Sequence, residues 1–165
     1  MAAPEQTVQL VSTKDIELFL PLMRDIDFGD TFLLSVLHWC GIGKRSRPLE
    51  YWQVFLLRAK SQIIGVSGLY RQPETPSHVC WLGWFAIRPQ FRRKGFGTAA
   101  IHQLCHAARG AGSTDLWVYT DRHDEVARIF YLSLGFEVLG AASDYAAGKT
   151  MDNSDIVLKR ILAAS

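Results

Sequence analysis

Three cations followed by two glycines form the most chemically suggestive stretch of this sequence. The cations at 92–94 stand directly before Gly95 and Gly97, between an apolar run and a helical pattern. Glycine permits positive φ and a close approach of the backbone, so successive N–H groups can point into one concavity. A helix that begins near Thr98 adds unpaired amide donors and the positive end of its dipole. This combination predicts a binding site for phosphate groups.

Changes of hydrophobic periodicity indicate the elements that would position this stretch. Strand-like runs lie at 8–11, 51–59, 62–70, 78–88, 115–120, 136–139 and 155–162, and helical patterns lie at 13–20, 31–39, 98–108 and 124–134. Ser12 or Thr13 can cap the first helix, which Pro21 interrupts, and Gly83 inside a strand-like run is typical of a bulge. The order predicts an α/β (α+β) fold, a mixed sheet of about seven strands flanked by about four helices.

Composition narrows the class of protein. The 165 residues carry a net charge of +2, which is too small to predict a nucleic-acid partner. No apolar run approaches the roughly 20 residues of a membrane span, and no signal peptide is visible. The three cysteines lack metal-like spacing and fit reduced thiols. We therefore expect a single soluble domain, residues 1–165, in the cytoplasm, without a metal, nucleic-acid or membrane partner.

Two motifs in this chain resemble those of the GNAT superfamily of acetyl-CoA-dependent N-acetyltransferases. Residues 92–97 (RRKGFG) match the family's pyrophosphate loop, Gln/Arg-x-x-Gly-x-Gly/Ala. Residues 124–136 (DEVARIFYLSLGF) are similar to its later helix, Asn-x-x-Ala-x-x-x-Tyr-x-x-x-Gly-Phe. The resemblance covers roughly residues 53–158 and implies the GNAT fold, whose mixed sheet is mostly antiparallel.

The resemblance also implies an activity and a cofactor site. It predicts transfer of an acetyl group from acetyl-CoA to a primary amine, on a small molecule or a peptide, by direct attack in a ternary complex. Backbone groups on the strand before the loop would hold the pantetheine arm, and loop amides and cations would hold the pyrophosphate. The residues implied in coenzyme A binding are Phe85, Ile87, Arg92, Arg93, Lys94, Gly95, Phe96, Gly97, Thr98 and Tyr131.

Tyr131 is the catalytic residue that the resemblance implies. Its hydroxyl would lie near the sulfur of the thioester and protonate the departing thiolate. The alternative is a tyrosine on an amphipathic helix that only packs against the sheet. The surrounding FYLSLGF sequence favours the catalytic role.

The general base is not evident from the sequence. Many family members carry a carboxylate or a histidine on the strand before the loop, but the matching residue here is Gly83, with Trp81 and Trp84 nearby. Asp124 replaces the motif's asparagine, and its charge disfavours a direct contact with an anionic cofactor. The remaining candidates are a chain of water molecules or the side chains of Glu50, His78, Asp121 and His123.

The acceptor is the least defined part of the prediction. In related proteins two loops line its pocket, and here they carry Asp25, Asp27, Asp30, Asp144, Asp152 and Asp155. Acidic loops favour a cationic amine, such as a polyamine-like molecule, an aminoglycoside or a peptide amine. Aromatic residues can instead wall an apolar site or fill the core: Trp39, Tyr51, Trp52, Tyr70 and Trp84.

Two other classes of function stay open. The chain can be a non-catalytic acyl-CoA-binding or sensing module, because no base is visible at Gly83. It can also be an interaction protein whose basic loop binds a phosphate-rich partner such as RNA, although the low net charge argues against this. The sequence leaves homodimer formation undecided.

Overall fold

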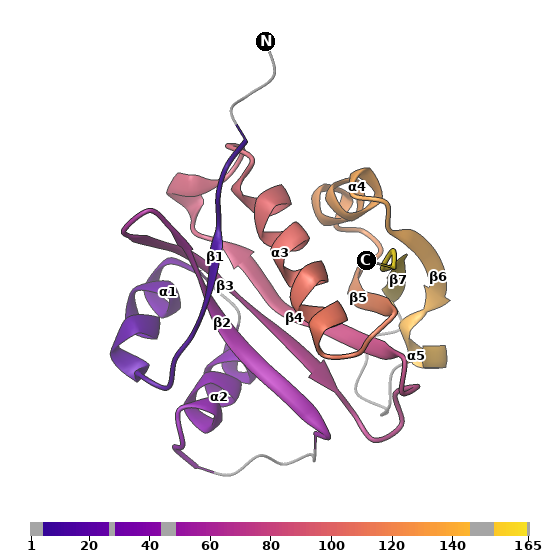
Figure 1. The fold of residues 1–165 in the computed structure, drawn as a ribbon, viewed down its shortest axis with the longest axis horizontal. Helices are drawn as coiled ribbons and strands as arrows, with labels where there is room; N and C mark the ends of the chain where they lie inside the picture. Colours follow the sequence, from indigo (N-terminus) through magenta and orange to yellow (C-terminus); the bar gives the residue numbers. More distant parts are fainter. Residues whose placement is uncertain (1–4, 27–28, 44–48, 146–153, 165) are drawn as a thin grey trace.

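The computed structural model describes residues 5–26, 29–43, 49–145 and 154–164, except for the side chains of 29–31. Its elements follow in the order β1 (Gln9–Ser12), η1 (Ile16–Phe19), α1 (Leu20–Asp25), α2 (Gly29–Trp39), β2 (Tyr51–Ala59), β3 (Gln62–Arg71), β4 (Val79–Ile87), η2 (Pro89–Phe91), α3 (Phe96–Gly110), β5 (Asp115–Asp121), α4 (Glu125–Ser133), β6 (Glu137–Ala141), α5 (Ala142–Tyr145) and β7 (Asp155–Ile161). This arrangement confirms the expected mixed α/β fold (Figure 1).

One sheet of seven strands, in the order β1-β2-β3-β4-β5-β7-β6, connects the whole described chain. Every neighbouring pair is antiparallel except β4 and β5, which are parallel. That pair is short, because it runs only from Val79 opposite Asp115 to Trp81 opposite Trp117. Beyond this point the two strands have no paired residues. The sheet therefore opens between the second half of β4 and the second half of β5.

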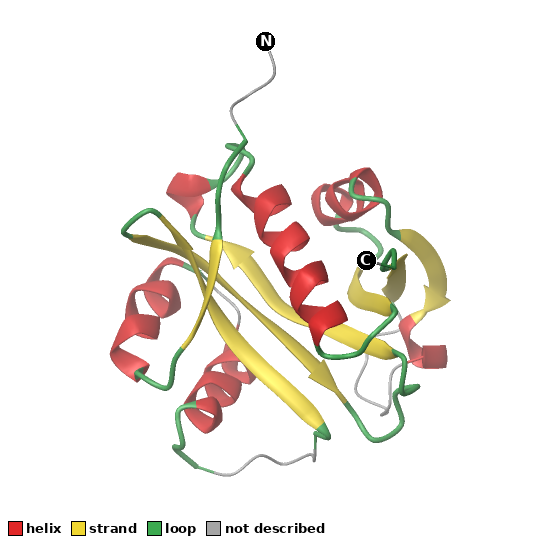
Figure 2. Cartoon of the chain, viewed as in Figure 1, coloured by secondary structure: helices red, strands yellow, loops and turns green. Residues whose placement is uncertain are grey.

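Helices cover both faces of the sheet (Figure 2). On one face, which we call the α3 face, Leu104 of α3 and Tyr131 of α4 pack in a cluster with Leu82 and Val118. On the other face, which we call the α2 face, α1 and α2 pack against β2 and β3, and Ala142 of α5 packs against Trp117. The part of the α2 face between α2 and α5 carries aromatic side chains of β2, β3 and β4.

The start of the first helical stretch differs from the predicted one. Its N-cap is Asp15, whose carboxylate accepts a hydrogen bond from the Glu17 amide at 3.0 Å, not Ser12 or Thr13. The chain forms a short 3-10 turn and then starts α1, with Pro21 in its first turn. Proline is favoured there because the first helical amides have no intrahelical partner. The interruption expected at Pro21 is therefore the point where the 3-10 turn ends and α1 begins.

Local signals around α4 and the β2–β3 hairpin agree with the prediction. Asp124 caps α4 by accepting a hydrogen bond from the Ala127 amide at 3.0 Å, and Gly135 follows its end with φ of +81°. Lys60, in the hairpin turn, also lies at positive φ, +53°. The short helix α5 was not predicted, because its four residues are too few to show a period.

Gly65 in β3 is required by a close approach of two backbones. A Cβ at this position would overlap the carbonyl oxygen of Ala86 in β4, which cannot rotate away as a side chain could. We expect Gly65→Ala to lower the free energy of unfolding by about 1–3 kcal/mol, as overpacking of a core does. The matched control is Gly110→Ala at the end of α3, where an added Cβ meets nothing within 4 Å. Urea unfolding of both variants tests this, and equal stabilities would contradict it.

Candidate functional site

The opening between β4 and β5 coincides with a bulge in β4. The β3–β4 register shifts between Val66, which faces Ala86, and Gly68, which faces Gly83. Trp84 lies in this bulge at φ of +50°, in the left-handed region that few residues other than glycine adopt. Trp84 and Phe85 thus have no paired residue in β3 or in β5. From Leu82 onward no residue of β4 pairs with β5, so this side of the strand offers its backbone groups to a ligand.

The N-terminus of α3 adjoins the end of β4 and leaves amide donors unpaired. The N-cap is Gly95 at φ of +84°, and it offers no side chain to the amides that follow. The first intrahelical bond runs from the Ala99 amide to the Gly95 carbonyl at 3.2 Å. The amides of Phe96, Gly97 and Thr98 precede this bond, as in the first turn of any helix. They form the positive end of a 15-residue helix, which is suited to an anion.

The three cations before this turn differ in what they already contact. Arg92 donates from Nε to the Ile87 carbonyl at 2.8 Å and so ties the loop to the end of β4. Lys94 donates from Nζ to the Gln90 carbonyl at 2.8 Å. Arg93 is exposed, lies at φ of +61°, and makes no hydrogen bond or ion pair with the described residues. Arg93 is therefore the cation of this loop that is most available to a phosphate.

Gly97 has a steric role that the sequence did not indicate. A Cβ at Gly97 would lie 3.2 Å from Cζ of Phe130 in α4. Phe130 in turn stacks on Phe85, with ring centroids 5.8 Å apart and planes 8° from parallel. These two rings join β4, α3 and α4 at the opening. Phe130 is a residue of the site that sequence analysis missed, although it directly precedes Tyr131.

Tyr131 continues this group of rings on the α3 face. Its ring centroid lies 5.3 Å from those of both Phe130 and Phe136, and 7% of the residue is exposed. Burial raises the pKa of the Tyr131 phenol above its ordinary value, and the carboxylate of Asp124 raises it further. The Tyr131 hydroxyl makes no hydrogen bond with the described residues, and it is not one of their fully buried polar atoms that lack a partner. Its oxygen is therefore accessible to solvent or to a ligand. This geometry suits a proton donor.

The candidate bases fall at opposite ends of the sheet. Glu50 and His78 precede β2 and β4, at the end where β4 and β5 are still paired. From His78 to Phe85 the strand covers roughly 20 Å at the usual rise per residue. Asp121 and His123 lie beyond the opening, where the Asp121 carboxylate accepts a hydrogen bond from the His123 amide at 2.8 Å. Asp121 and His123 are therefore the better placed pair.

The ring of Tyr70 occupies the space beside Gly83, the position where many family members carry the general base. A Cβ at Gly83 would lie 2.9 Å from Cε1 of Tyr70 in β3. Tyr70 is 8% exposed and lies against Trp81 and Trp84. An aromatic ring thus occupies the place of a carboxylate or histidine side chain at this point of β4.

Comparison with known proteins identifies the family. The model of the acetyltransferase (GNAT) family matches residues 19–136, which is more than half of the chain. The chain belongs to the GNAT family of acetyltransferases. An uncharacterized N-acetyltransferase, YycN, of Bacillus subtilis (strain 168) is 28% identical over 109 residues, 66% of this chain and 70% of that protein.

Solved structures of GNAT acetyltransferases share this fold. One from Elizabethkingia anophelis, with acetyl-CoA bound, has a TM-score of 0.64 at 16% identity and covers 96% of this chain and 99% of its own. An acetyltransferase of Bacillus subtilis in complex with CoA has a TM-score of 0.65 at 16% identity, with 96% and 100% covered. These likenesses confirm the predicted GNAT fold.

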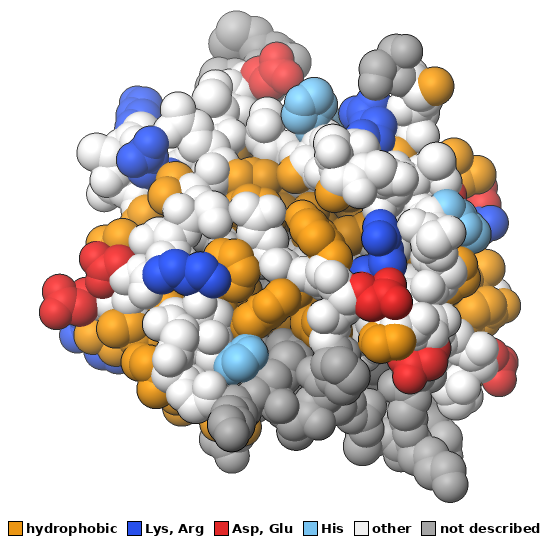
Figure 3. All heavy atoms as spheres, turned by 60° about the horizontal axis from the view of Figure 1, so that its bottom comes forward, with side chains coloured by type: hydrophobic (Ala, Val, Ile, Leu, Met, Phe, Trp, Pro, Cys, Tyr) orange, Lys and Arg blue, Asp and Glu red, His pale blue; other side chains and the backbone are white. Residues whose placement is uncertain are grey.

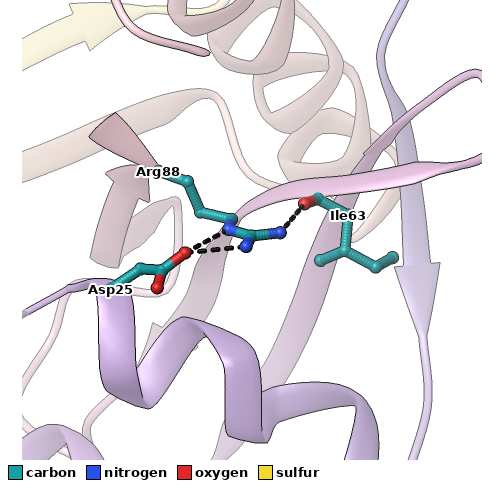
Figure 4. A network of polar contacts seen from close by, with 3 residues as sticks. All are labelled: Asp25, Ile63 and Arg88. Carbon is teal, nitrogen blue, oxygen red and sulfur yellow. Dashed lines mark hydrogen bonds and ion pairs between the residues drawn. The ribbon is translucent and has the colours of Figure 1, made fainter. Parts of the chain in front are cut away.

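One of the acidic side chains expected around the acceptor of this GNAT protein is neutralised. Asp25, at the end of α1, accepts from both Nε and Nη2 of Arg88 at 2.7 Å (Figure 4). Nη1 of Arg88 donates to the Ile63 carbonyl at 3.0 Å. Asp25 thus fixes α1 to the start of β3 and the end of β4 instead of offering a charge to an amine. Asp27 and Asp152 lie outside the described residues, as does the side chain of Asp30.

The Asp25–Arg88 contact allows a prediction about stability. Asp25→Ala removes the acceptor of two guanidinium N–H groups, and we expect the free energy of unfolding to fall by about 1 kcal/mol, because the pair is partly exposed. The control is Asp144→Ala, an exposed aspartate of α5 with no ion pair among the described residues. Thermal unfolding at low and high salt measures both variants. A difference that does not shrink at high salt would argue against an electrostatic origin.

Other features bound the site. A hollow of about 440 Å³ beside the α3 N-terminus is lined by Gly95, Thr98 and the segment 5–8, and none of its lining residues comes from β4 or β5. The Glu5 carboxylate in this lining disfavours an anion.

In the described part of the chain no three His, Cys, Asp or Glu side chains are placed to hold a metal. No described helix is long and apolar enough to cross a bilayer.

Proposed function

We propose that this GNAT protein transfers an acetyl group from acetyl-CoA to a primary amine. The observation that carries the proposal is the combination, beside the opening between β4 and β5, of unpaired amides at the α3 N-terminus with an unpaired stretch of β4. The amides of Phe96 to Thr98 and the side chain of Arg93 are suited to the pyrophosphate. Structures of GNAT acetyltransferases that hold acetyl-CoA or CoA support this donor.

The reaction we propose is a direct attack in a ternary complex. The amine nitrogen bonds to the thioester carbonyl carbon, and the carbon–sulfur bond then breaks. A backbone N–H at Phe85 would stabilise the oxyanion of the tetrahedral intermediate. The Tyr131 hydroxyl would give its proton to the departing thiolate and regain one from solvent. The amine loses its proton to water or to the Asp121–His123 pair.

A covalent acetyl-cysteine intermediate is disfavoured. Burial raises the pKa of each of the three cysteines, and it raises the pKa of Cys80 to about 11. The thiolate is the nucleophilic form of cysteine, so these thiols are poor nucleophiles at neutral pH. Cys80 and Cys105 are also buried. Direct transfer to the amine is the simpler route.

The test combines binding with product analysis. Titration calorimetry with acetyl-CoA measures donor binding, and a thiol reagent follows the release of free coenzyme A with a panel of primary amines. We expect thiol release that depends on the amine and matches the acetylated amine found by mass spectrometry. Thiol release without acetylated amine would mean hydrolysis and would contradict the proposal.

A second candidate is a non-catalytic acyl-CoA-binding module. It is favoured by one observation, the ring of Tyr70 beside Gly83 in place of a base. In that case acetyl-CoA binds in the calorimeter, but no amine in the panel accelerates thiol release. The same pair of measurements therefore separates the two functions.

A further inference from the structure

The side chain of Phe130 in α4 lies where the elements of the proposed site meet. Its ring stacks on that of Phe85 in β4, with centroids 5.8 Å apart and planes 8° from parallel. A Cβ on Gly97, in the first turn of α3, would lie 3.2 Å from Cζ of Phe130 and 3.9 Å from Cζ of Phe85. The ring centroid of Tyr131 is 5.3 Å from that of Phe130. The groups proposed to bind pyrophosphate, to stabilise the oxyanion and to protonate the thiolate therefore all adjoin Phe130.

Partial exposure alone does not distinguish these rings. Phe85 and Phe130 are both half-buried, and other hydrophobic side chains of the molecule are exposed. On the side that Figure 3 shows, hydrophobic side chains gather in the middle, and charged side chains lie mostly toward the edges. Exposed apolar side chains are normal on folded proteins. Phe130 differs from them in the elements that it joins.

The segment of β4 that Phe130 contacts lacks the support that a strand usually has. From Leu82 onward β4 has no paired residue in β5, and Trp84 and Phe85 have none in β3 either. Trp84 also takes a left-handed φ of +50°, a strained conformation that persists only where its surroundings enforce it. The ladder of the sheet therefore does not hold the Phe85 amide directly. The position of this amide depends on side-chain contacts instead.

Two rings hold this segment, one on each face of the sheet. On the α2 face the indole of Trp84 lies over Gly68, where a Cβ would be 2.5 Å from Cε3 of the indole. On the α3 face Phe85 stacks on Phe130, and in the described part of the chain this is its one ring contact. Phe130 in turn lies against Gly97 of α3. The stack of Phe85 on Phe130 thus sets the distance between the β4 backbone and the α3 N-terminus.

We infer that Phe130 is a positioning residue of the reaction, which holds the Phe85 amide in place relative to the amides at 96–98. This inference rests on the proposed function, in which the first amide stabilises the oxyanion and the others bind the pyrophosphate. One molecule of acetyl-CoA must reach both groups at once. A displaced β4 segment would therefore leave the donor bound with its carbonyl badly placed. Small displacements of reacting groups lower rates by about tenfold or more.

Phe136 is the matched control, because it shares one contact with Phe130. Its ring centroid is also 5.3 Å from that of Tyr131, and among the described residues this is its one ring contact. Phe136 is 2% exposed, so its replacement by leucine should cost more stability than the same change at half-buried Phe130. If Phe130 only packs, the loss of activity follows the loss of stability, and Phe136→Leu is the less active variant. If Phe130 positions the site, Phe130→Leu is the less active one.

The experiment measures kcat, donor affinity and unfolding temperature for wild type and both variants. Acetyl-CoA is saturating, and the acceptor is whichever of hexylamine, 2-phenylethylamine, spermidine and trialanine wild type acetylates fastest. We expect Phe130→Leu to lower kcat about tenfold and to keep its calorimetric affinity for acetyl-CoA within about fivefold, because the charge-assisted phosphate contacts remain. Phe136→Leu should lower kcat less than about threefold and the unfolding temperature more.

The outcomes separate the inference from the proposed function. An unchanged kcat in Phe130→Leu, or an equal loss of kcat in both variants, overturns the inference while acetyl transfer stands. No turnover by wild type with any amine overturns the proposed function and the inference with it.

Hydrogen exchange gives a readout that does not depend on turnover. With coenzyme A bound to wild type, the amides at 84–87 of β4 and at 96–98 of α3 should both be protected, because both would contact the ligand. In Phe130→Leu we expect exchange at 84–87 to become faster by about threefold or more, while 96–98 keep their protection. Faster exchange spread evenly over the sheet, as general destabilisation would give, overturns the inference.

Phe85→Leu tests the same stack from β4, because it removes the ring and keeps the backbone amide. If Phe130→Leu fails to fold, Phe85→Leu alone decides, with the same expected loss of kcat. In the double variant kcat should fall no more than about twofold below either single variant, because both changes break one contact. Losses that multiply to about 100-fold mean that the two rings act separately, and they overturn the inference.

Discussion

Tyr131→Phe should lower kcat by about 100-fold or more, the range typical of a lost general acid, while acetyl-CoA binds with nearly unchanged affinity. The ring makes the packing contacts with Phe130 and Phe136, and phenylalanine keeps that ring. Only the proton of the hydroxyl is lost. Steady-state kinetics and calorimetry of the variant measure the two quantities separately. A variant with unchanged kcat would remove Tyr131 from the mechanism.

The pH dependence adds a second readout for Tyr131. Because burial raises its pKa in the folded protein, the phenol stays protonated across the pH range of ordinary assays. The ratio of wild-type to variant kcat should therefore be constant from pH 6 to 9. The same shift contributes a loss of stability above about pH 10, where the Tyr131 phenol of the unfolded chain ionises first, so Tyr131→Phe should lose less stability there than wild type, in which Tyr51 and Tyr119 also have raised pKa values.

The control for this prediction is Tyr51→Phe. Tyr51 is half-buried on the α3 face, and its hydroxyl donates to Oε1 of Gln53 at 3.2 Å. It lies at the end of the sheet where β4 and β5 are still paired, so the same loss of a hydroxyl should leave kcat within about twofold. Tyr51 packs with the cluster of the α3 face, so of the two roles that the sequence allowed it takes the one in the core. If both variants lose activity equally, the loss reports on packing.

The order of the helices and strands could be predicted because each has its own hydrophobic periodicity and its own turn or cap residues. The seven strands begin and end within about two residues of the expected bounds, since turns such as Lys60-Ser61 and caps such as Gly135 are local signals. The β4–β5 parallel pair and the opening depend on which strands become neighbours. The family resemblance supplied only a mixed, mostly antiparallel sheet, and periodicity alone does not fix the strand order.

The faces of β4 could not be predicted, and the bulge is the reason. Strict alternation from Trp81 would place Phe85 and Ile87 on the α2 face, beside Trp81. The structure places both on the α3 face and turns Trp84 to the α2 face, because one extra residue shifts the phase. Gly83 indicated a bulge in this strand, and the register shift directly follows Gly83, but the sequence gives no signal that Trp84 takes a positive φ and changes face. The aromatic residues of β4 were therefore visible in the sequence, but the face of the sheet that each one takes was not.

Arg93→Glu should weaken acetyl-CoA binding by about 30-fold or more, because it replaces a charge-assisted contact to phosphate with repulsion. Arg93 makes no hydrogen bond or ion pair within the described part of the chain, so stability should change little. Arg92→Ala should differ, because Arg92 also holds the Ile87 carbonyl and its loss should lower both affinity and the unfolding temperature. Calorimetry and thermal unfolding distinguish the two patterns.

Lys60→Glu is the matched control for Arg93→Glu. Both residues are exposed cations at positive φ, +53° for Lys60 and +61° for Arg93, and both reversals change the net charge equally. Lys60 lies in the β2–β3 turn, outside the phosphate site, so it reports only the effect of net charge on an anionic ligand. That effect is screened by salt, and at physiological ionic strength it should stay below about threefold. Equal weakening by the two reversals would mean that the α3 N-terminus holds the phosphates without Arg93.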